Sequence, residues 1–214
     1  SLHYLRWKKE LPQSEDLFGL GGFGENIVAK HANERNMCIG DVVQIGSVIA
    51  QVCEPRQPCY KLNHRFQVKD MSKRSQDLFR TGWFYRILKE GTIQAGDEMN
   101  LLERPHPDWT VARVQYYLYH DLKNEEVMTE LVELKELGAE PRNIFINRLR
   151  KQFENQANRL EGVAMNIWTD YRVVAKKIET PRIASLVFEA VIPSASPEAV
   201  LPGSHVRLRL GGKL

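Results

Sequence analysis

The stretch Gln51–Asn63, QVCEPRQPCYKLN, marks the point where a predicted strand gives way to a loop that carries a cysteine. The apolar run Val48–Val52 predicts the strand, and two prolines follow it. Proline fixes φ and keeps the residue before it out of the helical region. We therefore expect Glu54–Cys59 to be a stiff, extended loop that leaves the end of the strand.

Cys59 is the first candidate for chemistry because it lies between two cations, Arg56 and Lys61. Nearby positive charge favours the thiolate, which is the form that attacks electrophiles and binds soft metals. The alternative, a small buried hydrophobic residue, stays open at this point. A structural zinc site is not expected, since no C-x-x-C pair occurs. The low number of cysteines, 3 in 214 residues, favours a reducing compartment.

Composition indicates an ordinary globular chain, with 43% hydrophobic and 27% charged residues. The net charge of +3 is too small to imply nucleic acid as a partner. No apolar run approaches the length that spans a bilayer, and no secretory signal is seen. We expect a cytoplasmic protein with neither a membrane nor a nucleic acid as its partner.

Short β-rich runs punctuated by glycine extend from the start to about Thr110. Gly40-Asp41 and Gly96-Asp97 each precede such a run and indicate turns, because aspartate bonds to nearby backbone and glycine supplies positive φ. Regularly spaced short strands predict a β-barrel or sandwich.

The next region, about His120–Gly162, has helical periodicity. Gly138 is predicted to end the first helix, and Pro141 to lie in the first turn of the second. The first helix has Val127, Leu131 and Leu134 at helical spacing. The second is predicted to place Phe145, Leu149, Phe153, Ala157 and Leu160 on one face.

From about Ile167 the pattern returns to strands. The runs Tyr171–Ala175, Ser185–Val191 and His205–Leu210 predict strands. The last run alternates apolar and basic residues, as a half-buried strand does. Three strands without a second layer rarely form a stable unit, so we interpret this tail as the beginning of a further domain.

Four motifs carry a family resemblance and occur in order. They are Gly22-Phe-Gly-Glu-Asn-Ile27, Cys38-Ile-Gly-Asp-Val42, Pro55-Arg-Gln-Pro-Cys-Tyr-Lys-Leu62 and Thr81-Gly-Trp-Phe-Tyr-Arg86. This chain resembles the MOSC domain, named from molybdenum cofactor sulfurases, in the branch with a three-helix extension. The tail, through Ile183–Glu189 and Leu201–Leu208, is similar to the opening strands of a ferredoxin-reductase-like flavin domain.

The resemblance implies a mainly β fold with added helices, in three parts. They are a MOSC-type β-barrel at 1–118, a small helical hairpin or three-helix subdomain at 119–166, and a truncated flavin domain at 167–214. The family's early His-Gly-Gly segment has no match here, so the barrel is expected to be incomplete at its N-terminus. The Arg-x-x-Ser flavin motif and an iron–sulfur cysteine cluster are likewise unmatched.

The same resemblance implies that Cys59 is the protein ligand of molybdenum. A soft thiolate suits a soft metal centre, and the pterin with its phosphate tail needs hydrogen-bond donors. His64, close in sequence, is a candidate for proton transfer because histidine titrates near neutrality. The predicted cofactor-binding residues are Gly24, Glu25, Asn26, Arg56, Lys61, Asn63 and Arg86. For Glu25 a purely structural role stays open.

The function implied is that of a molybdenum-cofactor oxidoreductase module acting on small N-hydroxylated compounds. Electrons would come from a reductase domain, in cis or in trans, with FAD or FMN and a 2Fe-2S cluster in a full-length fusion. The alternatives are a carrier of sulfur as a Cys59 persulfide or of the cofactor, and an interaction module with a decayed site. A homodimer is compatible with each.

Overall fold

The computed structural model describes residues 2–162, 170–181 and 183–191. The chain divides into two units, Ser1–Val163 and Ala164–Leu214. The first unit combines an antiparallel sheet with helices, so the mixed β and α fold predicted from the sequence is confirmed.

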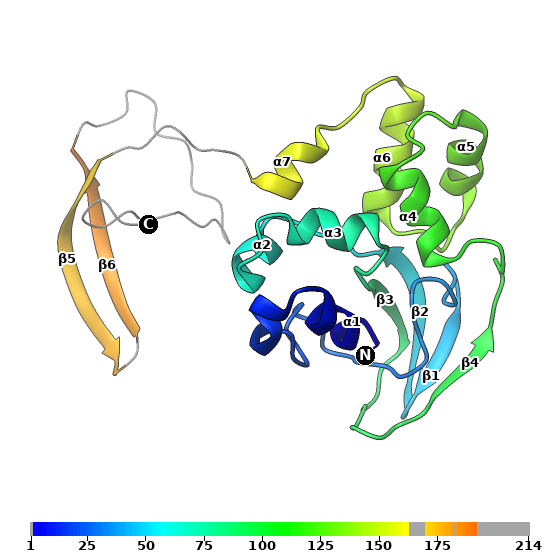
Figure 1. The fold of residues 1–214 in the computed structure, drawn as a ribbon, viewed down its shortest axis with the longest axis horizontal. Helices are drawn as coiled ribbons and strands as arrows, with labels where there is room; N and C mark the ends of the chain where they lie inside the picture. The colour runs from blue at the N-terminus through cyan, green and yellow to red at the C-terminus, as the bar shows by residue number, and fades with distance from the viewer. Residues whose placement is uncertain (1, 163–169, 182, 192–214) are drawn as a thin grey trace. The chain divides into compact units, whose positions relative to one another are not determined.

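The sheet of the first unit has four strands in the order β3-β2-β1-β4, and every neighbouring pair is antiparallel (Figure 1). The strands are β1 (Val42–Ile45), β2 (Val48–Pro55), β3 (Trp83–Lys89) and β4 (Met99–Glu103). A two-residue turn joins β1 to β2, and its Gly46 has a φ of +57° that favours glycine. The turns predicted at Gly40-Asp41 and Gly96-Asp97 do lead into β1 and β4.

Closure of this sheet into a barrel is not confirmed. In the described part of the chain β3 and β4 are the two edges, and they do not pair with each other. A closed barrel requires each strand to have a partner on both sides. The strands observed here therefore form an open sheet.

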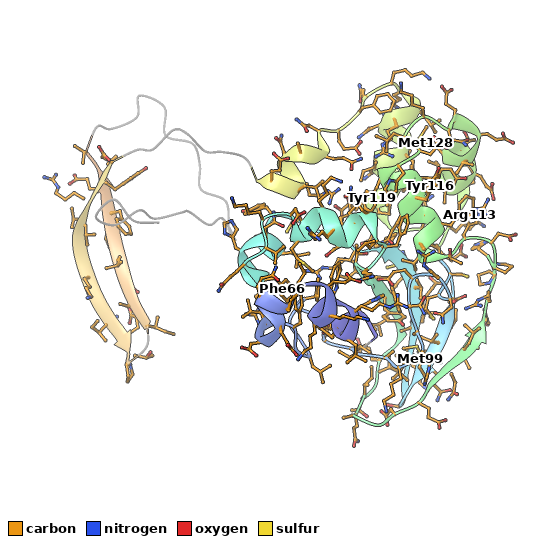
Figure 2. The ribbon with its side chains drawn as sticks, viewed as in Figure 1. Phe66, Met99, Arg113, Tyr116, Tyr119 and Met128 are labelled. Carbon is orange, nitrogen blue, oxygen red and sulfur yellow. The ribbon has the colours of Figure 1, made fainter. Side chains whose placement is uncertain are left out.

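The strands predicted before Thr110 are present as β1, β2 and β4, but several helices that were not predicted also lie within that region. They are α1 (Leu2–Glu10), the 3₁₀ helix η1 (Pro12–Leu17), α2 (Lys61–Phe66) and α3 (Met71–Asp77). Tyr4, Trp7 and Leu11 recur at helical spacing and are all buried, so the signal for α1 was present. Phe66 of α2, labelled in Figure 2, stacks on Phe18 with 4.6 Å between ring centroids. A small apolar core results, composed of Tyr4, Trp7, Leu11, Phe18, Leu62, Phe66, Val68 and Met71.

A second, larger core lies where helices cover the sheet. These helices are α4 (Val111–Tyr119), α5 (Glu125–Glu133) and α6 (Ala139–Leu149), and α4 and α6 contact β2 (Figure 1). Thr110 and Asn124 cap α4 and α5, because each side-chain oxygen accepts a backbone N–H of the first turn. None of the helices in the described ranges has the length and apolar character needed to cross a membrane.

Two expectations about the helical region were wrong. Gly138 does not end a helix: it is the N-cap of α6, with φ −62°, and its amide donates to Cys53 O at 2.8 Å. The predicted second helix is also divided, since α6 stops at Leu149 and α7 begins only at Gln156. Phe153 lies between them and is 48% exposed. Pro141 does lie in the first turn of α6, as expected.

The second unit contains an antiparallel hairpin in its described residues. Its strands are β5 (Tyr171–Thr180) and β6 (Ile183–Ala190), which confirms the two strands predicted there. The third predicted strand, His205–Leu210, and the Leu201–Leu208 motif lie outside the described residues.

Candidate functional site

The Cys59 loop, defined here as residues 56–60, connects the end of β2 to α2. β2 continues to Pro55, three residues beyond the predicted strand. The loop begins with a hydrogen bond from Arg56 N to Gly82 O at 3.0 Å, and it ends where Leu62 N donates to Cys59 O at 3.0 Å. These bonds anchor both sides of the cysteine to regular structure.

Cys59 is the accessible cysteine of the three. Its side chain is half-buried and free, whereas Cys38 and Cys53 are buried. Burial raises the pKa of both buried thiols, and the neighbouring carboxylates of Asp41 and Glu54 raise it further. Cys38 and Cys53 therefore fit the role of small buried hydrophobic residues, whereas Cys59 remains the candidate for chemistry.

Arg56 and Lys61 flank the thiol with cationic side chains. Arg56 is half-buried, and within the described residues its guanidinium makes no hydrogen bond. Lys61 is exposed on the first turn of α2. Both are therefore available to an anionic ligand.

The other two predicted residues of α2 differ in their availability. His64 is exposed, with its ring edge-on to Tyr60 at 6.0 Å between centroids. Asn63 is occupied: its amide donates to Leu160 O at 2.9 Å, and its oxygen accepts from Ser72 N at 2.7 Å. Asn63 thus holds α2 to its neighbours.

The segment Gly24–Asn26 lies close to α2, because the preceding Phe23 packs on Phe66 with 4.5 Å between ring centroids. Gly24 is exposed and has a φ of +80°, a conformation that favours glycine. Asn26 is exposed as well.

Glu25 organises the turn before it. Its carboxylate accepts from Tyr4 Oη at 2.5 Å, Gly21 N at 2.9 Å and Phe23 N at 3.0 Å. Burial and the bond to Glu25 together raise the pKa of Tyr4. These three donors show that Glu25 contacts the surrounding turn, and cofactor binding by Glu25 stays a prediction.

Arg86 is not brought to the Cys59 loop by the sheet register. It lies opposite Gln51, to which it donates a hydrogen bond at 3.1 Å, while Pro55 at the start of the loop lies opposite Trp83. Four residues of strand correspond to about 13 Å. Arg86 is therefore separated from the start of the Cys59 loop by about that distance along the strand pair.

Two of the pockets formed by described residues of the first unit have volumes of about 290 and about 460 Å³, and Cys59 lines neither of these two. The smaller one is rich in arginine, with Arg6, Arg35 and Arg80 in its lining. Its buried Glu34 accepts from His3 Nε2 and from Gly82 N, both at 2.8 Å. Sequence reasoning missed this pocket, because its residues come from three separate segments with no shared motif.

No cluster of three or more histidine, cysteine, aspartate or glutamate side chains in the described residues could hold a metal ion. A metal at Cys59 would therefore need its remaining ligands from a cofactor or from solvent. The chain does supply one accessible thiol, the exposed amide of Asn26 and the guanidinium of Arg56, which has no hydrogen bond to any residue that the structure describes. This donor set fits a phosphate-bearing pterin ligand through its polar groups.

Comparison with known protein families matches two regions of the chain. The family description "MOSC domain" matches residues 1–100, and "YiiM-like, 3-alpha helix domain" matches residues 109–152, which contain α4, α5 and α6. Protein YiiM of Escherichia coli is 31% identical over 161 residues, 75% of this chain and 71% of that protein. The chain belongs to the MOSC-domain family, in the group that carries the YiiM-like three-helix domain.

Solved structures and a longer relative extend the comparison. The crystal structure of YiiM from Escherichia coli matches with a TM-score of 0.71 and 30% identity, covering 75% of this chain and 80% of that one. The one from Geobacillus stearothermophilus matches with a TM-score of 0.65 and 31% identity, covering 69% and 74%. A protein of Gibberella moniliformis named "Reductase" is 46% identical over 114 residues, 53% of this chain. The chain spans only 20% of the length of that reductase.

Proposed function

We propose that this chain is a molybdenum-cofactor-binding oxidoreductase module in which Cys59 is the protein ligand of the metal. The observation that carries the proposal is the accessibility of Cys59 beside Arg56, in a chain of the MOSC family whose other two cysteines are buried. A thiolate is a ligand that soft metal centres prefer.

Arg56, Asn26 and Lys61 would bind and orient the cofactor. The planar fork of Arg56 can donate two parallel bonds to a phosphate or to a pterin oxygen. The amide of Asn26 can both donate to and accept from the edge of a pterin ring. When bound, the molybdenum–pterin group would supply a two-electron redox centre. In this assignment Glu25 and Asn63 hold the surrounding backbone, because their polar atoms are already hydrogen-bonded.

The proposed reaction is the reduction of a small N-hydroxylated compound. The N–O bond breaks, two electrons and two protons are consumed, and an amine and water are released. His64, exposed one turn into α2, is the proposed proton donor. Support for a reductive direction comes from the likeness to the Gibberella protein named "Reductase".

The electron donor is proposed to be a reductase domain carrying FAD or FMN and a 2Fe-2S cluster, fused or separate. The hairpin β5–β6 would be the beginning of its flavin domain. The low share of the Gibberella reductase that this chain spans is compatible with such a fusion.

The test is cofactor loading. Full-length protein purified from cells should contain molybdenum by mass spectrometry and pterin by fluorescence of its oxidised form. Cys59→Ser should lose most of the metal. Cys38→Ser is the matched control, since a serine keeps the donor that Cys38 Sγ directs to Pro107 O. Full-length protein without metal and pterin, or Cys59→Ser with undiminished metal, would contradict the proposal.

A second candidate function, a sulfur carrier, is favoured by one observation: the Cys59 thiol is accessible on a surface loop, and a persulfide needs no large cavity. In that case the outer sulfur of the persulfide would pass to an acceptor nucleophile, leaving the Cys59 thiolate. Mass spectrometry of protein from cells would show Cys59 heavier by one sulfur atom, with no electron transfer to N-hydroxylated compounds in the full-length protein.

A further inference from the structure

Helix α7 (Gln156–Glu161) makes direct contact with the Cys59 loop, although about a hundred residues separate them in the sequence. The guanidinium of Arg159 donates to Pro58 O, and the carbonyl oxygen of the same residue accepts from Tyr60 N at 2.8 Å. Arg159 therefore bonds to the residue on each side of Cys59. Together the two bonds fix the backbone from which the thiol projects.

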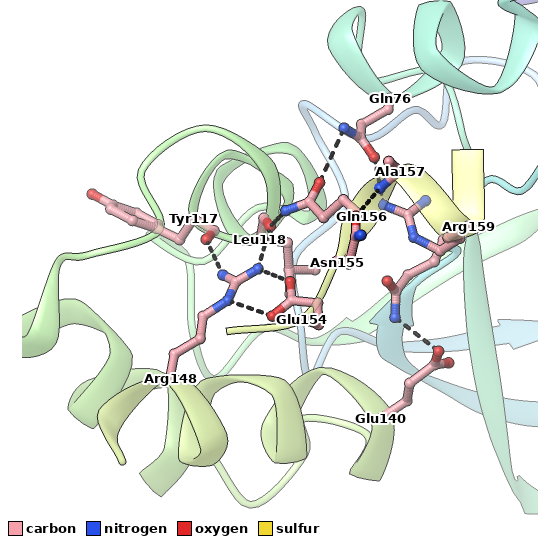
Figure 3. Close-up of polar contacts among 11 residues, drawn as sticks. Gln76, Tyr117, Leu118, Glu140, Arg148, Glu154, Asn155, Gln156, Ala157 and Arg159 are labelled. Atoms are coloured by element: carbon pink, nitrogen blue, oxygen red, sulfur yellow. Dashed lines mark hydrogen bonds and ion pairs between the residues drawn. The ribbon is translucent and has the colours of Figure 1, made fainter. Parts of the chain in front are cut away.

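The guanidinium of Arg159 is itself held from several directions. It donates to Gln76 Oε1 of α3 at 2.6 Å, a bond drawn in Figure 3. It also lies over the ring of Tyr119, 5.2 Å from the centroid, at the end of α4. A planar, pre-organised group with three partners loses little freedom on bonding to the loop. Its position at Pro58 O is thus determined by α3 and α4 together.

The last turn of α7 is joined to the same region by its free carbonyl groups, which a helix end cannot satisfy internally. Leu160 O accepts from Asn63 Nδ2 at 2.9 Å and from Ser72 Oγ at 2.8 Å. Gly162, with a φ of +82°, lies against the ring of Tyr60, where a Cβ atom would come within 3.2 Å. The end of α7 therefore packs on the loop residue that follows Cys59.

We infer that α7 is a clamp on the Cys59 loop and that Arg159 is the positioning residue of the thiol. α7 lies outside both matched family regions, which end at residues 100 and 152. The clamp thus lies in the segment between the matched three-helix region and the second unit. The inference rests on the proposed function only in treating Cys59 as the thiol that takes part in the chemistry.

The experiment measures how fast Cys59 reacts with iodoacetamide, resolved from Cys38 and Cys53 by peptide mass spectrometry. Arg159→Ala should speed alkylation of Cys59 by about fivefold, because a lost hydrogen bond lets the loop open more often. Arg159→Lys should give an intermediate rate, since lysine keeps the charge but lacks the fork that bridges Pro58 and Gln76. Asn158→Ala, at the exposed neighbouring position, is the control and should stay within about twofold of wild type.

Hydrogen exchange gives a second measurement that general destabilisation would not reproduce. Arg159→Ala should speed exchange in a peptide covering residues 56–62, with β1 and β2 unchanged. If that variant does not fold, Gly162→Ala presses on Tyr60 instead and should likewise accelerate both alkylation and exchange. Unchanged Cys59 reactivity in the folded variant, or equal acceleration in Asn158→Ala, would overturn the inference. Alkylation needs no cofactor, so this result is independent of molybdenum loading.

Discussion

At the scale of one residue, the buried charge of Arg148 connects α6, the end of α4 and the segment that follows α6. Its guanidinium is 1% exposed and donates to Tyr117 O at 2.9 Å and to Leu118 O at 2.7 Å, both near the end of α4. It also forms an ion pair with Glu154, after the end of α6 (Figure 3). The last carbonyl groups of α4 have no backbone N–H of the helix to accept from, so the guanidinium of Arg148 donates to them instead.

Replacing this arginine should therefore destabilise the first unit. Arg148→Ala leaves two carbonyls and a carboxylate without their donor and opens a cavity, which together should cost about 3 kcal/mol. The measurement is urea denaturation followed by tryptophan fluorescence. Arg150→Ala, at the exposed C-cap of α6, should change the free energy of unfolding by less than about 0.5 kcal/mol. Equal losses in the two variants would contradict this role for Arg148.

Residue identity alone made Cys59 a candidate but did not predict the contacts of its neighbours. Arg56 was a stronger candidate than Asn63 in the sequence. The Arg56 side chain makes no hydrogen bond within the described ranges, whereas the amide nitrogen and oxygen of Asn63 are both hydrogen-bonded. Arg159 carried no signal, because its partners Pro58 and Gln76 are defined only by folding. Such contacts depend on tertiary packing, which local sequence patterns do not encode.

At the scale of elements, the sequence predicted the strands better than the short helices. β1 and β2 follow Gly-Asp and glycine turns and consist mostly of β-branched or apolar residues, so local propensity and burial agree. α3 is rich in charge and polar residues, which hid its buried side, where Ser72, Ser75 and Gln76 are inside. A helix whose buried face is polar cannot be recognised from apolar periodicity.

The break between α6 and α7 shows the same limitation. Phe153 continued the apolar spacing of Phe145 and Leu149, and so predicted one helix. The chain instead turns at Lys151, where φ is +63°, and Asn155 caps a new helix by accepting from Ala157 N at 3.0 Å. Asn155 was a recognisable capping signal that could have placed this boundary.

The connections that flank α4 and α5 are tied by one titratable pair. His106, after β4, bonds to Glu136, after α5, with 2.8 Å between Nε2 and Oε2. The hydrogen bond from His106 holds the pKa of Glu136 below its ordinary value of 4.5. A depressed carboxyl pKa adds stability that is full above the ordinary value and is lost as pH falls through the lower one.

The pH dependence of this pair can be isolated with a neutral variant. Glu136→Gln should reduce the free energy of unfolding by about 0.5–1 kcal/mol at pH 6, because the pair is three-quarters buried. The difference from wild type should shrink as the pH is lowered below 4.5. Glu133→Gln, exposed on α5, is the control and should show no such trend. A difference that grows on acidification would have the wrong sign for a depressed carboxyl pKa.

At the scale of the whole molecule, the two units differ in how much apolar surface their strands bury. In the first unit β2 contacts α4 and α6, and Val43 and Ile45 of β1 lie in the same core, whereas the edge strands expose large apolar side chains. These are Phe84, Ile87, Leu88, Leu101 and Leu102. Leu101 and Leu102 are consecutive, so they point to opposite faces of β4. Stability in the sheet should therefore decrease from its centre to its edges.

The strands of the hairpin β5–β6 bury the least apolar surface, and hydrogen exchange tests whether they are also the least stable. Among the described residues of the second unit, nearly every residue of both strands is exposed, and two strands that bury so little apolar surface are marginally stable in water. We expect its amides to exchange at rates near those of an unfolded chain, while β1 and β2 exchange only through rare opening of the first unit. Mass spectrometry of peptides 171–180 and 48–55 from the same sample makes the comparison internal. Equal protection of the two peptides would contradict this expectation, because two strands with exposed faces have too little buried apolar area to resist opening.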